Sequence, residues 1–115
     1  MKSLAALLLL LSAWAPSPAS ATDVSALAEW ATALQRSVLG NWARPPGHAE
    51  TAVHCRIYLK ISPIGVVESA EIKEPCGDAA LEQSVRSAVQ RSSPLPLPRD
   101  PAVFQRSLVL NFQAL

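Results

Sequence analysis

The sequence predicts an α+β domain whose helices and strands follow one another in the order α-β-β-α-β. Two segments place apolar residues at helical spacing, and three shorter segments alternate apolar and polar residues as half-buried strands do. A hairpin has one apolar face, which two helices can cover, and a third strand widens a sheet otherwise too narrow to be stable. We therefore expect a three-stranded antiparallel sheet with two helices packed on one face.

The N-terminus has the features of a secretory signal peptide. Lys2 precedes a leucine-rich stretch of about twelve residues, and Ala19-Ser20-Ala21 fits the small-residue cleavage pattern. The apolar stretch is shorter than the roughly twenty residues of a membrane-spanning helix. We expect residues 1–21 to be removed and residues 22–115 to form an exported domain that does not insert into a membrane.

The remaining chain, about 94 residues, is long enough for one domain but not for two. Without Lys2 it carries nine Lys and Arg against nine Asp and Glu, so its net charge is zero. This balance disfavours a nucleic-acid partner, which requires a basic face.

The chain contains two cysteines, Cys55 and Cys76. In an exported protein they are most simply paired. The bridge would close a loop of about twenty residues and stabilise the fold by roughly 3 kcal/mol in the chain-entropy model.

The first helix is predicted over residues 25–41, with Asp23 or Ser25 as N-cap, and Pro45 and Pro46 prevent its continuation. Its apolar positions at helical spacing are Leu27, Ala31, Leu34 and Val38, with Trp30 beside them.

A β-hairpin is predicted next. Residues 53–61 alternate strictly, the turn sequence SPIG follows, and residues 66–73 return with Val66, Ala70 and Ile72 on one face. The register stays open, because Glu68 interrupts the second strand's apolar alternation.

The second helix is predicted to begin after Asp78 as N-cap and to end near Ser92. Its apolar face consists of Leu81, Val85, Ala88 and Val89. The last strand is predicted over residues 107–113, with Leu108, Leu110 and Phe112 facing one way.

Residues 93–104 hold four of the ten prolines. Three interpretations are open: a stiff connector that delivers the last strand, a polyproline ligand for another protein, or a disordered segment.

No motif in the chain indicates catalysis. His48 and His54 have no metal-ligand spacing with the cysteines, and there is no phosphate-binding loop or nucleophile motif. Glu68, Glu71 and Glu74 are expected to be solvated surface charges. We therefore expect no enzyme activity, no metal and no cofactor.

Three stretches resemble a known family. GNWARPPG closes the first helix, CRIYLKISPIGVVESAEI forms the hairpin, and CGDAALEQSVRSAVQRSSPLPLPRDPAVFQRSLVLNF covers the remainder. In this order they resemble the C-terminal domain of TolA, within the TonB C-terminal domain group, over residues 25–112.

The resemblance implies a periplasmic interaction domain of Gram-negative bacteria that binds extended segments of partner proteins. Partners of relatives are Tol or Ton envelope components such as TolB-type proteins, outer-membrane receptors, and colicins or filamentous phage. It also implies that the third strand lies at an open sheet edge and that a disulfide lies near the sheet. TolA and TonB join this domain to a membrane helix, whereas this chain has a cleavable-looking signal, so we expect a stand-alone member.

An open edge is a template for another strand, so we expect strand addition there. Arg106 is a candidate for steering acidic segments, or simply a solvated surface arginine. The alternative function is a small secreted or periplasmic inhibitor or effector that reuses the fold. The candidate partner-binding residues are Arg106, Ser107, Leu108, Val109, Leu110, Asn111 and Phe112.

Processing gives the first testable prediction. The protein recovered from the periplasm of an expressing Gram-negative host should begin at Thr22, as measured by intact mass and N-terminal sequencing. A mature protein that keeps Lys2 and its apolar stretch would contradict the signal-peptide interpretation.

Overall fold

The computed structural model of the chain describes residues 18–115. The predicted signal peptide, residues 1–21, therefore lies almost entirely outside the described part. The elements are α1 (Pro18–Gly40), β1 (Val53–Ile61), β2 (Val67–Glu74), α2 (Ala79–Arg91), the 3₁₀ turn η2 (Pro101–Val103) and β3 (Ser107–Ala114).

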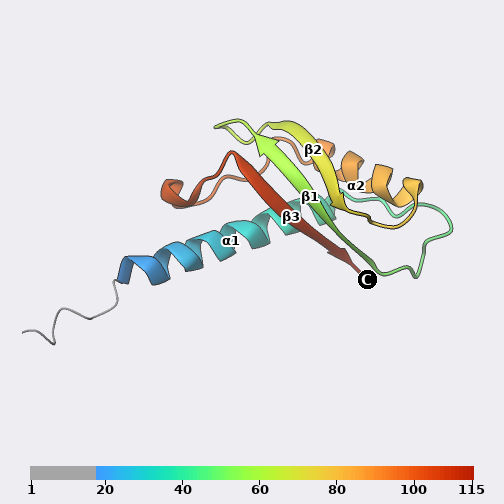
Figure 1. The fold of residues 1–115 in the computed structure, drawn as a ribbon, viewed down its shortest axis with the longest axis horizontal. Coiled ribbons are helices and arrows are strands. Elements are labelled where there is room, and N and C mark those ends of the chain that lie inside the picture. Colours follow the sequence, from blue (N-terminus) through green and yellow to red (C-terminus); the bar gives the residue numbers. More distant parts are fainter. Residues whose placement is uncertain (1–17) are drawn as a thin grey trace, which may run out of the picture.

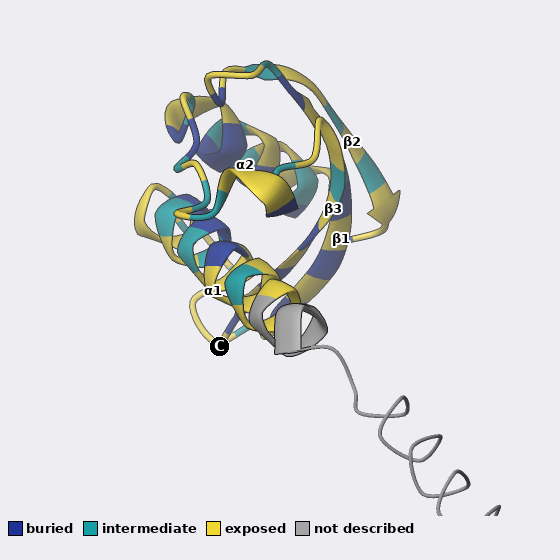
Figure 2. Ribbon diagram, turned by 90° about the vertical axis from the view of Figure 1, so that its left-hand side faces the viewer, coloured by how far each residue is buried: buried dark blue, intermediate teal, exposed yellow. Residues whose placement is uncertain are grey.

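The strands form one antiparallel sheet in the order β2-β1-β3 (Figure 1). Both helices lie against the same face of this sheet, where α1 contacts β3 and α2 contacts β2 (Figure 2). The α+β class, the element order and the two-layer arrangement predicted from the sequence are confirmed. The hydrophobic core lies between the two layers.

Strand β1 has the predicted bounds and crosses the middle of the sheet. Its odd-numbered residues from Val53 to Ile61 are all buried beneath the helices. The even-numbered side chains lie on the opposite, uncovered face, as the period of two requires. This central strand fixes which face of each neighbouring strand is buried.

Strand β2 differs from its predicted bounds by one residue at each end, because the pairing of β1 with β2 contains two register shifts. At one shift Lys60 pairs with Ser69 while Ile61 pairs with Val67, so Glu68 is an extra residue. Such a bulge changes the alternation by one position. Val67, rather than Val66, therefore packs against the core.

Helix α1 begins earlier than predicted, so it spans the predicted cleavage site after Ala21. Its buried stripe consists of Trp30, Leu34 and Val38. Leu27 and Ala31, which were expected in this stripe, are exposed, because they face a hollow between α1 and β3 rather than the core.

Helix α2 has the predicted N-cap and the predicted end. The Asp78 side chain accepts a hydrogen bond from the Leu81 amide at 2.9 Å. All four predicted apolar positions of α2 are buried. Local signals, a cap and one clear stripe, were sufficient for this element.

The proline-rich segment between α2 and β3 is a packed connector. Leu95 is buried, and its amide donates to the Gly65 carbonyl in the hairpin turn. The Trp30 indole donates to the Pro96 carbonyl at 2.8 Å, and Phe104 stacks on Trp30 with 5.7 Å between ring centres. Of the three interpretations left open by the sequence, these contacts support the connector.

Gly65 is required where the connector meets the hairpin. Its φ of +89° lies in the left-handed region, and a Cβ here would collide with the Leu95 carbonyl oxygen. Only glycine satisfies both conditions without strain.

The predicted pairing of Cys55 with Cys76 is confirmed, with 4.7 Å between their Cα atoms. The bridge joins β1 to the loop that precedes α2, and both residues are buried. It therefore joins the central strand of the sheet to the segment from which α2 begins.

Breaking this bridge gives the second prediction. Cys55→Ser should lower the free energy of unfolding by about 2–5 kcal/mol, measured by urea titration, because the 21-residue separation is no longer constrained in the unfolded state. Cys76→Ser should lose a similar amount, and the double variant no more than about the larger single loss. Losses that add fully would show that each thiol contributes by packing rather than through the bridge.

Candidate partner-binding edge

The two edges of the sheet differ in how they are protected. Half of the residues of β2 are charged, and its pairing with β1 contains two register shifts. Charges and bulges are the devices that keep an edge from pairing with another chain. In contrast, β3 contains no charged residue and pairs with β1 without a shift from Ser107 to Ala114.

The backbone direction along β3 follows from one hydrogen bond. The Ile61 amide donates to the Arg106 carbonyl at 2.8 Å, so the backbone groups of Arg106 face β1. Because these groups alternate along an antiparallel strand, residues 108, 110 and 112 also face β1. Residues 107, 109, 111 and 113 therefore direct their N–H and C=O groups toward the free edge.

The predicted partner-binding residues thus divide into two sets. Ser107, Val109 and Asn111 combine outward backbone groups with exposed side chains on the uncovered face of the sheet. Leu108, Leu110 and Phe112 direct their side chains toward the helices, and the last two are buried.

Arg106, the remaining predicted residue, lies just before β3 and has partners within the chain. Its Nε donates to the Ile61 carbonyl at 2.6 Å, and its Nη2 lies 3.0 Å from Glu68 Oε1. These contacts tie the start of β3 to the bulge in β2. Its role in steering a partner stays a prediction.

A groove of ≈ 470 Å³ runs between α1 and β3 along the free edge. None of its lining residues is titratable, and most of them are apolar. The lining residues are Leu27, Trp30, Ala31, Thr32, Leu34, Gln35, Gln105, Leu108, Val109, Leu110 and Asn111.

The sequence did not predict that residues of α1 line this groove. Leu27, Ala31 and Gln35 lie at successive four-residue intervals, beside the buried stripe. The available signal was the width of the apolar face of α1, which exceeds what one core stripe needs. Leu27 is 41% exposed and lies in the groove instead of the core.

The uncovered face next to β3 carries basic side chains from β1. Arg56 is paired with Asn111 across the strands, and Lys60 with Ser107. Arg56 has a partner in Glu74 at 3.7 Å.

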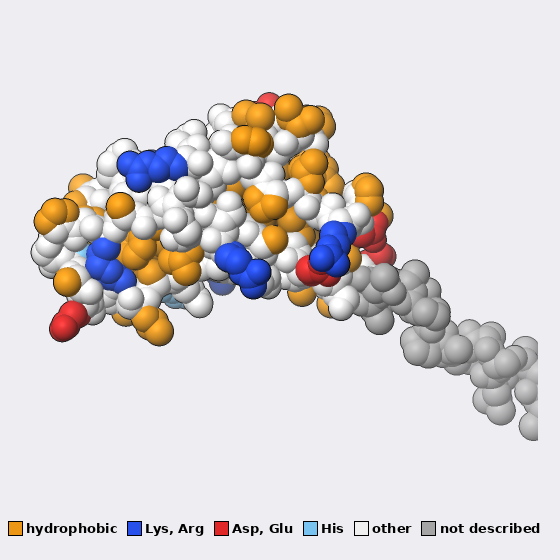
Figure 3. Space-filling view, turned by 180° about the vertical axis from the view of Figure 1, so that it is seen from behind, with side chains coloured by type: hydrophobic (Ala, Val, Ile, Leu, Met, Phe, Trp, Pro, Cys, Tyr) orange, Lys and Arg blue, Asp and Glu red, His pale blue; other side chains and the backbone are white. Residues whose placement is uncertain are grey.

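On the helix side of the molecule, Lys and Arg side chains are scattered among apolar and uncharged ones (Figure 3).

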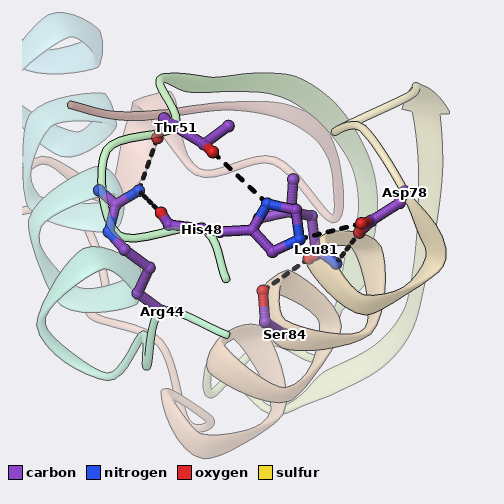
Figure 4. A network of polar contacts seen from close by, with 6 residues as sticks. All are labelled: Arg44, His48, Thr51, Asp78, Leu81 and Ser84. Carbon is purple, nitrogen blue, oxygen red and sulfur yellow. Dashed lines mark hydrogen bonds and ion pairs between the residues drawn. The ribbon is translucent and has the colours of Figure 1, made fainter. Parts of the chain in front are cut away.

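A separate polar network holds the loop between α1 and β1 against α2 (Figure 4). His48 Nε2 lies 2.9 Å from Asp78 Oδ2, and His48 Nδ1 lies 3.4 Å from the Thr51 hydroxyl. Arg44 donates to the carbonyls of His48 and Thr51.

The order Thr51, His48, Asp78 has the outline of a hydroxyl, base and acid chain, but each contact has a structural use. Asp78 also caps α2, and none of the three side chains lines the groove at β3. Within residues 18–115, no cluster of three or more His, Cys, Asp or Glu is placed to hold a metal ion. In the same range, no helix has the length and apolar character needed to cross a membrane.

Both the sequence and the fold are similar to those of known proteins. Residues 27–112 match the family model described as TonB C terminal. The chain is similar in structure to TolAIII in a solution NMR structure bound to a peptide derived from the N-terminus of TolB. That similarity has a TM-score of 0.60 and 22% identity, and covers 74% of this chain and 72% of the other. No curated protein matches the chain in sequence.

The network around Asp78 gives the third prediction. The hydrogen bond from the Leu81 amide, helped by His48, holds the pKa of the Asp78 carboxyl below its ordinary value of 3.8. A lowered pKa stabilises the fold above the unfolded value, and this contribution is lost as the pH falls through the folded value. In urea titrations, the advantage of the wild type over Asp78→Asn should shrink as the pH falls through and below 3.8.

Asn is the matched replacement because it also caps helices but does not titrate. An advantage that stays constant through the acid range would mean that the charge of Asp78 does not contribute.

Proposed function

The chain belongs to the TonB C-terminal family, and we propose from this that it is a protein–protein interaction module of the cell envelope that binds an extended partner segment by strand addition at β3. One observation carries the proposal: β3 is an uncharged, unshifted edge strand whose outward backbone groups border an apolar groove.

Backbone groups supply the first part of the binding energy. The outward N–H and C=O groups of Ser107, Val109 and Asn111 match those of an incoming strand in either direction. Main-chain pairing of this kind is insensitive to the partner's sequence, so it provides affinity without selectivity.

Side chains supply selectivity on the two faces of the added strand. Every second side chain of the partner would enter the groove between β3 and α1, which favours apolar residues at those positions. The others would lie on the uncovered face beside Val109 and Asn111. Lys60 of β1 would lie two strands away, about 10 Å, and favours acidic residues there.

The family and the disulfide support a proposal for the class of partner. TolAIII binds a peptide from the N-terminus of TolB, and the disulfide suits an oxidising compartment. We propose a periplasmic location, after removal of residues 1–21, and an envelope partner of the Tol or Ton type. Because no side chain in the groove is titratable, the groove is suited to binding rather than to acid–base catalysis.

The fourth prediction tests strand addition with Val109→Pro. Proline removes an outward N–H that β1 does not use, so β3 stays paired with β1. A synthetic peptide from the N-terminus of the TolB encoded in the same genome should bind this variant about tenfold more weakly or worse, measured by calorimetry.

The matched control is Ala70→Pro on the opposite edge. By the same alternation, Ala70 directs its backbone away from β1, and it does not line the groove. It should bind like the wild type. If Val109→Pro keeps its circular dichroism spectrum and binds with unchanged affinity, strand addition at β3 is wrong, and the helix faces or the proline-rich connector become the candidate surfaces.

A further inference from the structure

Gln35 of α1 reaches across the groove to the free edge of β3. Its Nε2 donates to the Gln113 carbonyl at 3.1 Å. The orientation of the amide is fixed by chemistry, because a carbonyl oxygen accepts hydrogen bonds and only the NH₂ end can donate one. This bond links two residues 78 positions apart in the chain.

The contact is made at an outward-facing position. Gln113 belongs to the series 107, 109, 111 and 113, whose backbone groups face the free edge. The Gln35 amide carries the same donor and acceptor as a peptide group, so it occupies the Gln113 carbonyl as an added strand would. Among residues 18–115, Gln113 is the one member of this series whose carbonyl accepts a side-chain hydrogen bond.

The shape of the surface changes at the same place. The groove between α1 and β3 is lined by β3 residues up to Asn111 and by α1 residues up to Gln35. Gln113 instead lines a separate hollow, together with Leu39 and Leu115. Gln35 therefore stands at the end of the groove.

The other end of the Gln35 amide is unusual. Its Oε1 is buried and accepts no hydrogen bond from the described residues. A buried polar atom without a partner is unfavourable and rare in folded proteins. Packing alone would favour an apolar side chain here. The role of the amide is therefore the hydrogen bond that its NH₂ group donates to Gln113.

We infer that Gln35 sets the end of the added strand: the partner pairs with residues 107–111 and stops before Gln113. This inference rests on the proposed strand addition and adds the length and register of the segment that the site accepts. The ligand is an extended peptide that pairs through about five residues and has apolar side chains on the side that faces α1. At Gln35 the peptide chain either ends its contact with β3 or turns away from it.

The fifth prediction uses NMR scalar couplings across hydrogen bonds, which identify the donor to each carbonyl. The probe is a ¹⁵N-labelled TolB N-terminal peptide of about twelve residues, which is longer than β3, and it is added to protein labelled with ¹³C and ¹⁵N. In the wild type, peptide amides should couple to the carbonyls of Val109 and Asn111, while Gln113 stays coupled to the Gln35 side chain.

Gln35→Ala keeps the helix, because alanine is a strong helix former, and it frees the Gln113 carbonyl. In this variant a peptide amide should couple to Gln113. Thr32→Ala is the matched control, since Thr32 lines the same groove without contacting β3 through a hydrogen bond. It should behave as the wild type.

The outcomes separate the two ideas. Coupling of the peptide to Val109 and Asn111, together with coupling to Gln113 already in the wild type, would overturn the role of Gln35 and keep strand addition. The same holds if Gln35→Ala gains no coupling at Gln113. Absence of coupling at Val109 and Asn111 would overturn strand addition itself.

Discussion

The unshifted pairing of β3 with β1 is the contact on which the remaining structure depends. Because side chains alternate with a period of two, this register places Leu110 and Phe112 in the core and leaves Val109 and Asn111 outside. A slip by one residue would expose the apolar set and reverse the direction of every backbone group at the edge. The register of β3 against β1 thus determines both which residues form the core and which groups face the candidate site.

Both ends of β3 are held by contacts that leave its outer edge accessible. Arg106 ties its start to Ile61 and Glu68, while Arg44 bonds the Leu115 carbonyl at its end and lies over the Trp42 ring. Trp42 in turn packs edge-on against Phe112, with ring centres 5.3 Å apart. A strand fixed in this way would need little ordering to accept the proposed partner segment, and this favours affinity.

The sequence was sufficient wherever an element is determined by its own residues. The strict alternation of β1 and the Asp78 cap of α2 gave correct bounds. The bulge at Glu68 was not predictable, because it depends on how β2 aligns with β1. The edge position of β3 came from family resemblance. The groove and the contact from Gln35 to Gln113 required tertiary structure, since they join α1 to a strand far along the chain.

The unequal edges of the sheet limit what the domain can assemble. The edge at β2 is bulged and charged, so only the edge at β3 is suited to pairing with another strand. A sheet that gains a strand at β3 cannot pass the addition on from its other side. Two copies that met through β3 would form a closed two-fold pair, because a chain with a single usable edge cannot build a fibril. The charges and register shifts of β2 therefore disfavour repeated edge-to-edge pairing, although β3 itself is uncharged and unshifted.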